Sequence, residues 1–414
     1  MARAGWTVMV YLAGDNDLSA AGEVDLEEMR QVGSTPDVHV VAQFDRAGVE
    51  GTRRFHVEKG GVGEEVVSLG ETDSGAPAVL EAFVRWAIGR FPADRNALVL
   101  WNHGGGWAPA ELDGLARSRS AAGFSLREAN ERAASPLGRV MFRSSWTRLL
   151  SLPTAAERAI CSDDGSGHSL DTVELGGVLA RVARDLGRRI DLLGLDACLM
   201  SCLEVAFEAR PHVEVLVASE ADEPVDGWPY ARVLGALAAE PTLSARPFAA
   251  RIVEEYAEDY RARGYQGDVT LAAFDLQRLG PLVGRLDELA AALVAELPPA
   301  AEAAWKAQRA TPHFCRQTQW DLARLAENLA GGAAGAPVRE AAKAIGESLR
   351  PAADGPALAS RQSGAGVAGC GGLALYLPPL VRVSPYYADL AFARGCRWSR
   401  WLAAYHQALA DLRQ

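Results

Sequence analysis

The first half of the chain alternates apolar runs of strand length with segments of helical periodicity. The runs are 6–12, 38–44, 53–57, 66–69, one that ends at His103, one that ends near Leu195, and 213–218. Between them, apolar residues spaced three and four apart predict helices at 23–32, 76–91, 170–186 and 199–210. Strands that alternate with helices are typical of a parallel sheet with right-handed crossovers, so we expect one α/β domain over residues 1–236.

The second half is richer in helical patterns. Its predicted elements are helices at 244–263, 276–297 and 398–412 and short buried strands at 269–274 and 372–377. We therefore expect a helix-rich C-terminal region, 237–414, that contributes at least one strand.

The periodicity fails in the middle of the first domain. Residues 104–160 are rich in serine, alanine and arginine and show no clear repeat over most of their length. A long irregular segment within a compact domain is usually a functional lid, an inserted loop or a disordered stretch. We expect this segment to be a flexible or cleavable insertion.

Composition narrows the class of protein. The 414 residues carry a net charge of -11, which argues against nucleic-acid binding because that requires a basic stripe. An acidic surface can instead attract cationic substrates. No apolar run approaches the roughly 18 residues of a membrane span, and no signal segment precedes the first strand, so we expect a cytoplasmic protein that does not bind membranes. The six cysteines form no zinc-ribbon or disulfide pattern, and we expect reduced thiols.

Two of the apolar runs end in a reactive side chain. The run that begins at Ala97 leads to His103, and the run that begins at Ile190 leads to Cys198. If the two runs are neighbouring parallel strands, both side chains emerge at the same carboxyl edge, where open α/β sheets place their ligand sites. The helix predicted from residue 199 would favour the thiolate through its dipole, and His103 would serve as the base. This arrangement predicts a cysteine nucleophile.

Each of the two residues also has a simpler interpretation. A free cysteine at a strand end is commonly a small buried hydrophobe, and a histidine in a loop is commonly held by hydrogen bonds. The three glycines after His103 favour chemistry, because their uncovered N–H groups, together with that of Cys198, can face a developing oxyanion. The combination of both motifs therefore favours catalysis over packing.

Other motifs are weaker. Residues 104–106 lack the spacing of a phosphate loop, and the Asp-Asn-Asp sequence at 15–17 is better explained as a turn than as a ligand set for a hard metal ion. Cys202 lies one helical turn after Cys198 but does not form a CxxC pair. His168 is a rival base, which we rank second because it precedes a helix rather than following an apolar strand.

These motifs resemble the clostripain family of cysteine peptidases, which belongs to the caspase-like clan. The matching segments are Trp6 to Asp17, His103 to Trp107, Asp196 to Ser201, Glu223 to Tyr230 and Gly372 to Pro378. The strand-His-Gly segment paired with Asp-Ala-Cys is the specific part of the resemblance. It implies a caspase-like α/β/α sandwich with a mostly parallel sheet, and a cysteine endopeptidase, a hydrolase that acts through a thioester acyl-enzyme.

The resemblance also implies roles for individual residues. His103 and Cys198 would form the catalytic dyad, with the N–H groups of Gly104 and Cys198 at the oxyanion. Asp196 and Asp226 would line an S1 pocket that prefers arginine and also takes lysine, because a guanidinium is well matched by carboxylates in a partly desolvated pocket. The alternative for Asp226 is a turn residue in an Asp-Gly pair.

Many members of this family are made as precursors that cut themselves after the histidine strand. The corresponding stretch of this chain contains Arg117, Arg119, Arg127, Arg132, Arg139 and Arg143 as possible autocleavage sites. An uncut insertion is the alternative. Some relatives need calcium, but no acidic cluster in the sequence demands it, so we expect no metal and no cofactor.

Expected partners are protein or peptide substrates with basic P1 residues, and we expect a monomer. The competing hypothesis is a catalytically silent protein that uses the same fold for binding. A nucleotide- or metal-dependent enzyme would need a phosphate loop or a ligand cluster that the sequence lacks.

Overall fold

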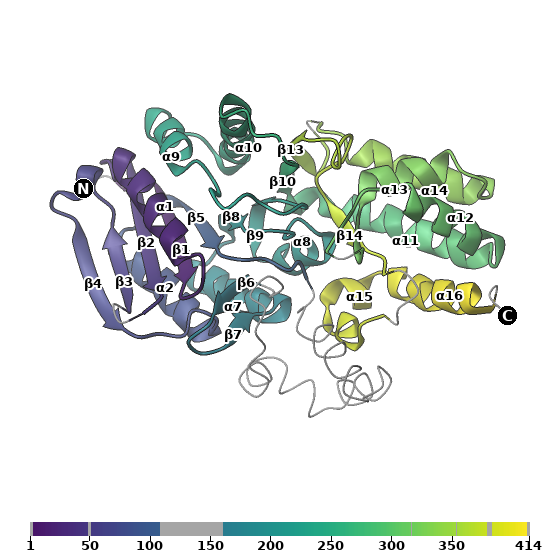
Figure 1. Cartoon of the computed structure of the whole chain (residues 1–414), viewed down its shortest axis with the longest axis horizontal. Coiled ribbons are helices and arrows are strands. Elements are labelled where there is room, and N and C mark those ends of the chain that lie inside the picture. The colour runs from purple at the N-terminus through teal and green to yellow at the C-terminus, as the bar shows by residue number, and fades with distance from the viewer. Residues whose placement is uncertain are drawn as a thin grey trace.

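The computed structural model describes residues 3–48, 51–107, 160–315, 317–352, 354–378 and 383–411, and its centre is a nine-stranded sheet (Figure 1). The strands of this sheet are β1 (Ala4–Gly14), β2 (Val38–Arg46), β3 (Thr52–His56), β4 (Glu65–Gly70), β5 (Ala93–Trp101), β8 (Ile190–Asp196), β9 (Val213–Ala218), β10 (Val269–Asp275) and β13 (Ala357–Ser363). Their order across the sheet is β13-β10-β9-β8-β5-β1-β2-β3-β4.

The middle of the sheet is parallel and its two margins are antiparallel. Strands β2, β1, β5, β8 and β9 pair in parallel, whereas β3, β4, β10 and β13 join through antiparallel pairs. The predicted α/β sheet with a parallel centre is confirmed. The division into 1–236 and 237–414 stays a prediction, and the sheet takes strands from both sides of that boundary.

Helices cover both faces of the sheet. On one face lie α1 (Ser19–Val32), α9 (Tyr230–Ala239) and α10 (Ala245–Ala262); on the other lie α2 (Pro77–Arg90), α7 (Thr172–Leu186) and α8 (Leu203–Ala209), as Figure 1 shows. Alternate residues of β1 point to opposite faces of the sheet: Val8 and Val10 pack in one apolar cluster, and Met9 and Tyr11 pack in the other. The result is an α/β/α sandwich with a core on each side.

Local sequence signals account for where these elements begin and end. The strand β1 is buried along nearly all of its length, as its continuous apolar run predicts. Helix α7 begins with a capping box in which the Asp171 carboxylate accepts the Glu174 N–H at 2.7 Å, and it ends at Gly187 in the left-handed conformation.

The C-terminal part adds a second group of helices beyond β13 and β10. These are α11 (Leu279–Ala295), α12 (Pro299–Arg309), α13 (Leu322–Ala330), α14 (Ala336–Ser348), α15 (Ala391–Gly395) and α16 (Trp398–Asp411). The shorter elements of the chain are β6 (Ile160–Asp163), β7 (His168–Leu170), β11 (His313–Phe314), β12 (Gln319–Asp321), β14 (Ala374–Tyr376) and the 3-10 turns Lys59–Gly61, Leu276–Arg278 and Pro385–Asp389. The sequence analysis missed α12, α13 and α14; in α12 the buried stripe is largely alanine, which contrasts weakly with its polar face.

Three sequence predictions have outcomes at this level. All six cysteines are free thiols, as expected. Within the described residues, none of the helices combines the length and the apolar character that crossing a bilayer requires. Most of the predicted insertion, including the six arginines named as possible autocleavage sites, lies outside the described residues.

Candidate active site

The two reactive side chains lie at the carboxyl ends of neighbouring parallel strands. β5 and β8 pair so that Trp101 lies opposite Asp196, and the Asn102 N–H donates to the Asp196 carbonyl at 3.2 Å. His103 and Cys198 each follow this pair by two residues. The loop backbones are in close contact, because a Cβ atom added to Gly104 would lie 2.1 Å from the Cys198 carbonyl oxygen. The strand arrangement predicted for the two motifs is therefore present.

His103 is held by an aspartate from a third strand end. Its Nε2 lies 2.7 Å from Oδ1 of Asp17, in the turn that follows β1. Asn16 makes that turn, because its amide donates to the Ala13 carbonyl at 3.0 Å and its Oδ1 accepts the Leu18 N–H at 2.9 Å. The turn was predicted, and its contact with the histidine was not.

The Cys198 thiol is half-buried against the backbone of Glu223. The Glu223 N–H donates to Sγ at 3.1 Å, and the thiol lies 3.7 Å from the Glu223 carbonyl oxygen. Burial, and after it the Glu223 carboxylate, raise the pKa of the thiol to about 12. The thiol is therefore protonated at neutral pH.

The prediction that a helix dipole activates Cys198 is wrong. Helix α8 begins at Leu203 rather than at residue 199, with Cys202 as its N-cap. Leu199 has a left-handed φ of 68°, and its N–H donates to the Ala221 carbonyl at 3.1 Å instead of entering a helix. The dipole acts mainly over the first turn of a helix, so the thiol lies outside its reach.

Asp196 is the centre of a buried group of carboxyl side chains, which also contains Asp25 and Glu223. Asp196 is 3% exposed, and it accepts hydrogen bonds from the Tyr230 hydroxyl at 2.8 Å and the Trp228 N–H at 3.3 Å. We call Asp25, Asp196 and Glu223 the S1 group, after the S1 role that the sequence predicts for Asp196.

The carboxyls of the S1 group have raised pKa values. Burial, and then the neighbouring carboxylates, raise the pKa of Asp25 to about 9; burial raises the pKa of Asp196 to about 6 and lifts that of Glu223 well above its ordinary range. Among the described residues, no arginine, lysine or histidine forms an ion pair with any of the three. The group is a desolvated acidic site without a cation of its own.

Asp226 lies at the surface beside this group. Its carboxylate accepts from Nη1 of Arg263 at 3.0 Å, and its side chain is 66% exposed. Residues 224–227 form a turn closed by the Gly227 N–H, which donates to the Pro224 carbonyl at 2.9 Å. Asp226 is therefore a turn residue, which was the alternative stated for it. The neighbouring Gly227 packs with its backbone against the Asp196 carboxylate.

The remaining candidates have other surroundings. His168 pairs with Asp73 through Nδ1, away from the β5 and β8 loops. Cys202 is fully buried, and burial raises its pKa well above the ordinary value, so it behaves as a core residue. Gly104 forms an isolated antiparallel bridge with Ile160 in addition to its contact with Cys198.

Two members of the S1 group escaped the sequence analysis. Glu223 opens a segment that was recognised as a motif, although no role was assigned to it. Asp25 lies on the buried face of α1 beside Leu26 and Met29. An acidic residue at a core position of an amphipathic helix was the signal that could have identified it.

Comparisons with known proteins agree with this arrangement. The model of the clostripain family matches residues 10–125 and 147–320. Clostripain from Hathewaya histolytica is 25% identical over 335 residues, which are 69% of this chain and 55% of that protein, so the chain spans little more than half the length of that relative.

Two solved structures share the fold, each with a TM-score of 0.66. One is a secreted C11 cysteine protease from Bacteroides thetaiotaomicron in complex with an irreversible peptide inhibitor, 18% identical, with 97% of this chain and 99% of that one covered. The other is an inactive zymogen C11 protease from Parabacteroides distasonis, 16% identical, with 96% and 99% covered. The predicted caspase-like fold is confirmed, and the chain belongs to the clostripain family.

Proposed function

We propose that this protein is a cysteine endopeptidase that cleaves after basic residues, with arginine preferred over lysine. Cys198 is the nucleophile and His103 is the general acid and base. The S1 group is the observation that carries the proposal. Its three carboxyls are buried without a cation of their own, and one of them belongs to Glu223, whose N–H contacts the nucleophilic sulfur.

The substrate itself helps to ionise the thiol. Because the Glu223 carboxylate is one cause of the raised thiol pKa, a guanidinium bound in the S1 group would offset that carboxylate and lower the pKa of Cys198. Peptides without a basic P1 residue lose this assistance as well as the binding energy. The preference for a basic P1 residue should therefore appear both in the rate of the chemical step and in the affinity for the peptide.

The catalytic cycle follows from the residues at the two strand ends. His103 takes the proton of the Cys198 thiol, the thiolate attacks the carbonyl carbon, and the oxyanion forms near the N–H groups of Cys198 and Gly104. His103 protonates the leaving amine, and the Asp17 carboxylate orients the imidazole and stabilises its protonated form. Water then attacks the thioester, with His103 as base, and releases the acid product.

We also propose that the chain cuts itself after one of the arginines between residues 104 and 160. The same specificity would apply to this segment, which contains Arg117, Arg119, Arg127, Arg132, Arg139 and Arg143. The S1 group would bind the side chain of that arginine and the Cys198 thiol would attack the bond after it, as proposed for a peptide substrate. Cleavage would break the chain between β5, which precedes His103, and β8, which precedes Cys198.

A panel of reporter peptides tests the proposal. Peptides that differ only at P1, with Arg, Lys, Ala or Asp, are offered to the wild type, to Cys198→Ala and to Cys396→Ala, which removes a buried thiol far along the chain. We expect the Arg peptide to exceed the Ala peptide in kcat/KM by roughly 100-fold, since a desolvated charge pair is worth about 3 kcal/mol.

Cys198→Ala should abolish turnover, whereas Cys396→Ala should retain it. Cleavage that survives Cys198→Ala, or no cleavage of any peptide, contradicts the proposal. Mass mapping of the same samples should find a new terminus after an arginine of residues 104–160 in the wild type and an intact chain in Cys198→Ala.

A further inference from the structure

A second buried group lies at the other end of the short segment whose Glu223 contacts the Cys198 thiol. It consists of Glu220, Asp321 and Cys370, whose ligand atoms all lie within 4.8 Å of one another. The three residues come from separate parts of the chain: Glu220 follows β9, Asp321 ends β12 and caps α13, and Cys370 precedes β14. We call them the rear group.

The contacts of the rear group leave one acceptor unused. Oε1 of Glu220 accepts the Gly372 N–H at 3.0 Å, and Oδ2 of Asp321 accepts the Gly371 N–H at 2.8 Å. Oε2 of Glu220, on a residue that is 0% exposed, receives no N–H or O–H donor, although the Glu220 and Asp321 carboxyls lie within hydrogen-bond contact of each other. A desolvated carboxylate oxygen is costly unless a proton or a cation neutralises it.

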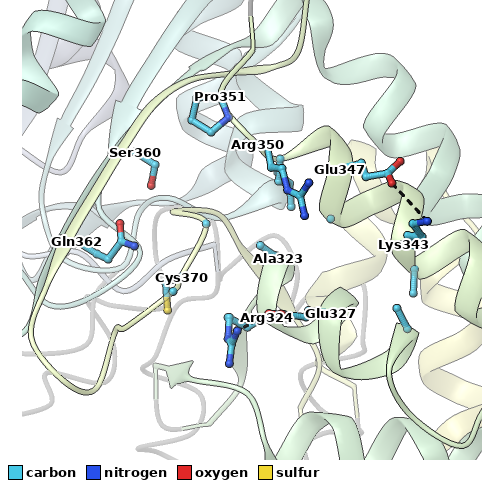
Figure 2. Close-up of a pocket in the computed structure, with 16 residues that line it drawn as sticks. Ala323, Arg324, Glu327, Lys343, Glu347, Arg350, Pro351, Ser360, Gln362 and Cys370 are labelled. Carbon is cyan, nitrogen blue, oxygen red and sulfur yellow. Dashed lines mark hydrogen bonds and ion pairs between the residues drawn. The ribbon is translucent and has the colours of Figure 1, made fainter.

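A cavity gives access to the group. Cys370 and Gly371 line a hollow of about 390 Å³ between α13, α14 and β13, with Arg324, Ser360 and Gln362 around it (Figure 2). The Arg324 guanidinium at this hollow pairs with Glu327. An ion can therefore reach the group past Cys370, and the cavity has room for a water ligand.

We propose that Glu220, Asp321 and Cys370 bind one zinc ion. A thiolate with two carboxylates suits a borderline-soft cation that accepts few ligands, and a water from the cavity completes four-coordination. Calcium takes six to eight oxygen ligands and magnesium an octahedral oxygen set, so neither fits a site with a sulfur donor.

The bound ion would hold the backbone that supports the nucleophile. The residues on either side of Glu220 accept hydrogen bonds from the Cys198 loop: the Ser219 carbonyl from the Ser201 N–H at 2.7 Å, and the Ala221 carbonyl from the Leu199 N–H at 3.1 Å. The rear group lies outside the proposed catalytic machinery, and zinc binding there does not depend on the peptidase activity.

Zinc binding to the full chain tests the site. The experiment uses Cys198→Ala, so that the catalytic thiol cannot capture the ion, and adds either Cys370→Ala or the matched Cys396→Ala. Native mass spectrometry and calorimetry with zinc chloride should find one ion bound by Cys198→Ala and by its Cys396→Ala derivative. Adding Cys370→Ala should weaken binding at least tenfold, since even outer-shell partners of a metal are worth roughly 10- to 100-fold in affinity.

Cobalt provides a second measurement that does not depend on affinity. Co²⁺ in the site should show a thiolate charge-transfer band that Cys370→Ala removes and Cys396→Ala keeps. Glu220→Gln, which preserves shape, should weaken zinc binding in a protein whose thermal unfolding shows that it is folded. Absence of zinc uptake, or uptake and a cobalt band that persist in Cys370→Ala, would overturn the proposal.

Discussion

Two buried acidic groups flank one short segment of this molecule, and they differ in what they are suited to bind. The S1 group ends that segment at Glu223 and contains only carboxyls, with the Tyr230 hydroxyl as a hydrogen-bond donor. The rear group begins it at Glu220 and adds a thiol and the N–H groups of two glycines. A carboxyl set matches a planar organic cation, whereas the added sulfur favours a metal ion. A buried acidic group is stabilised by a bound positive charge. The other ligand atoms of the group determine whether an organic cation or a metal ion supplies that charge.

The largest effect that separates the two groups should come from Asp196→Asn. The amide keeps the size of the carboxyl but removes its charge, so kcat/KM for the Arg peptide should fall by roughly 100-fold, about 3 kcal/mol. Turnover of the Ala peptide should change far less, and zinc affinity should not change. Steady-state kinetics with both peptides and a zinc titration on the same variant give the three values.

Glu220→Gln is the matched variant on the other side of the segment. It should lose zinc affinity and keep the ratio of Arg to Ala turnover. Equal losses of both peptide activities in Asp196→Asn, or a changed P1 ratio in Glu220→Gln, would mean that the two groups are not separate sites.

The sequence predicted the strands that present His103 and Cys198 better than it predicted the acidic residues around them. β9 occupies the predicted residues, and the loops that carry His103 and Cys198 are neighbours because parallel strands bring their carboxyl ends to one edge. Asp17 and Asp25 join the site from β1 and α1, and their roles depend on the strand order and on packing, which a local pattern does not encode. The start of α8 was wrong because apolar spacing continues through residues 199–202 while the backbone there is extended or left-handed.

The second effect is on stability and concerns the raised pKa of Asp25. Because the pKa is about 9 in the folded state and near 4 when unfolded, the folded protein binds more protons between these values, and the free energy of unfolding must fall as pH rises. Between pH 6 and pH 8 we expect Asp25 to account for about 3 kcal/mol of that fall. Asp25→Asn, which resembles the protonated acid, should remove this part of the pH dependence.

Urea unfolding at the two pH values measures the effect. Asp37→Asn, at an exposed position just before β2, is the control and should follow the wild type. A stability of Asp25→Asn that depends on pH as strongly as the wild type would show that Asp25 is not a protonated member of the S1 group, and the comparison would then rest on Asp196 and Glu223.

The smallest effect should come from Arg263→Ala at the rim of the S1 group. Arg263 pairs with Asp226 at the surface, so it competes with a substrate cation for that carboxylate. Exposed pairs are worth a fraction of a kcal/mol, and removing the competitor should raise kcat/KM for the Arg peptide by roughly two- to threefold at low salt and by less at high salt. Arg232→Ala, which breaks a comparable pair with Glu255, should leave that value unchanged. If Arg263→Ala has no effect at low salt, Asp226 is a turn residue alone, and P1 recognition belongs to the buried carboxyls, where desolvation rather than surface charge supplies the attraction.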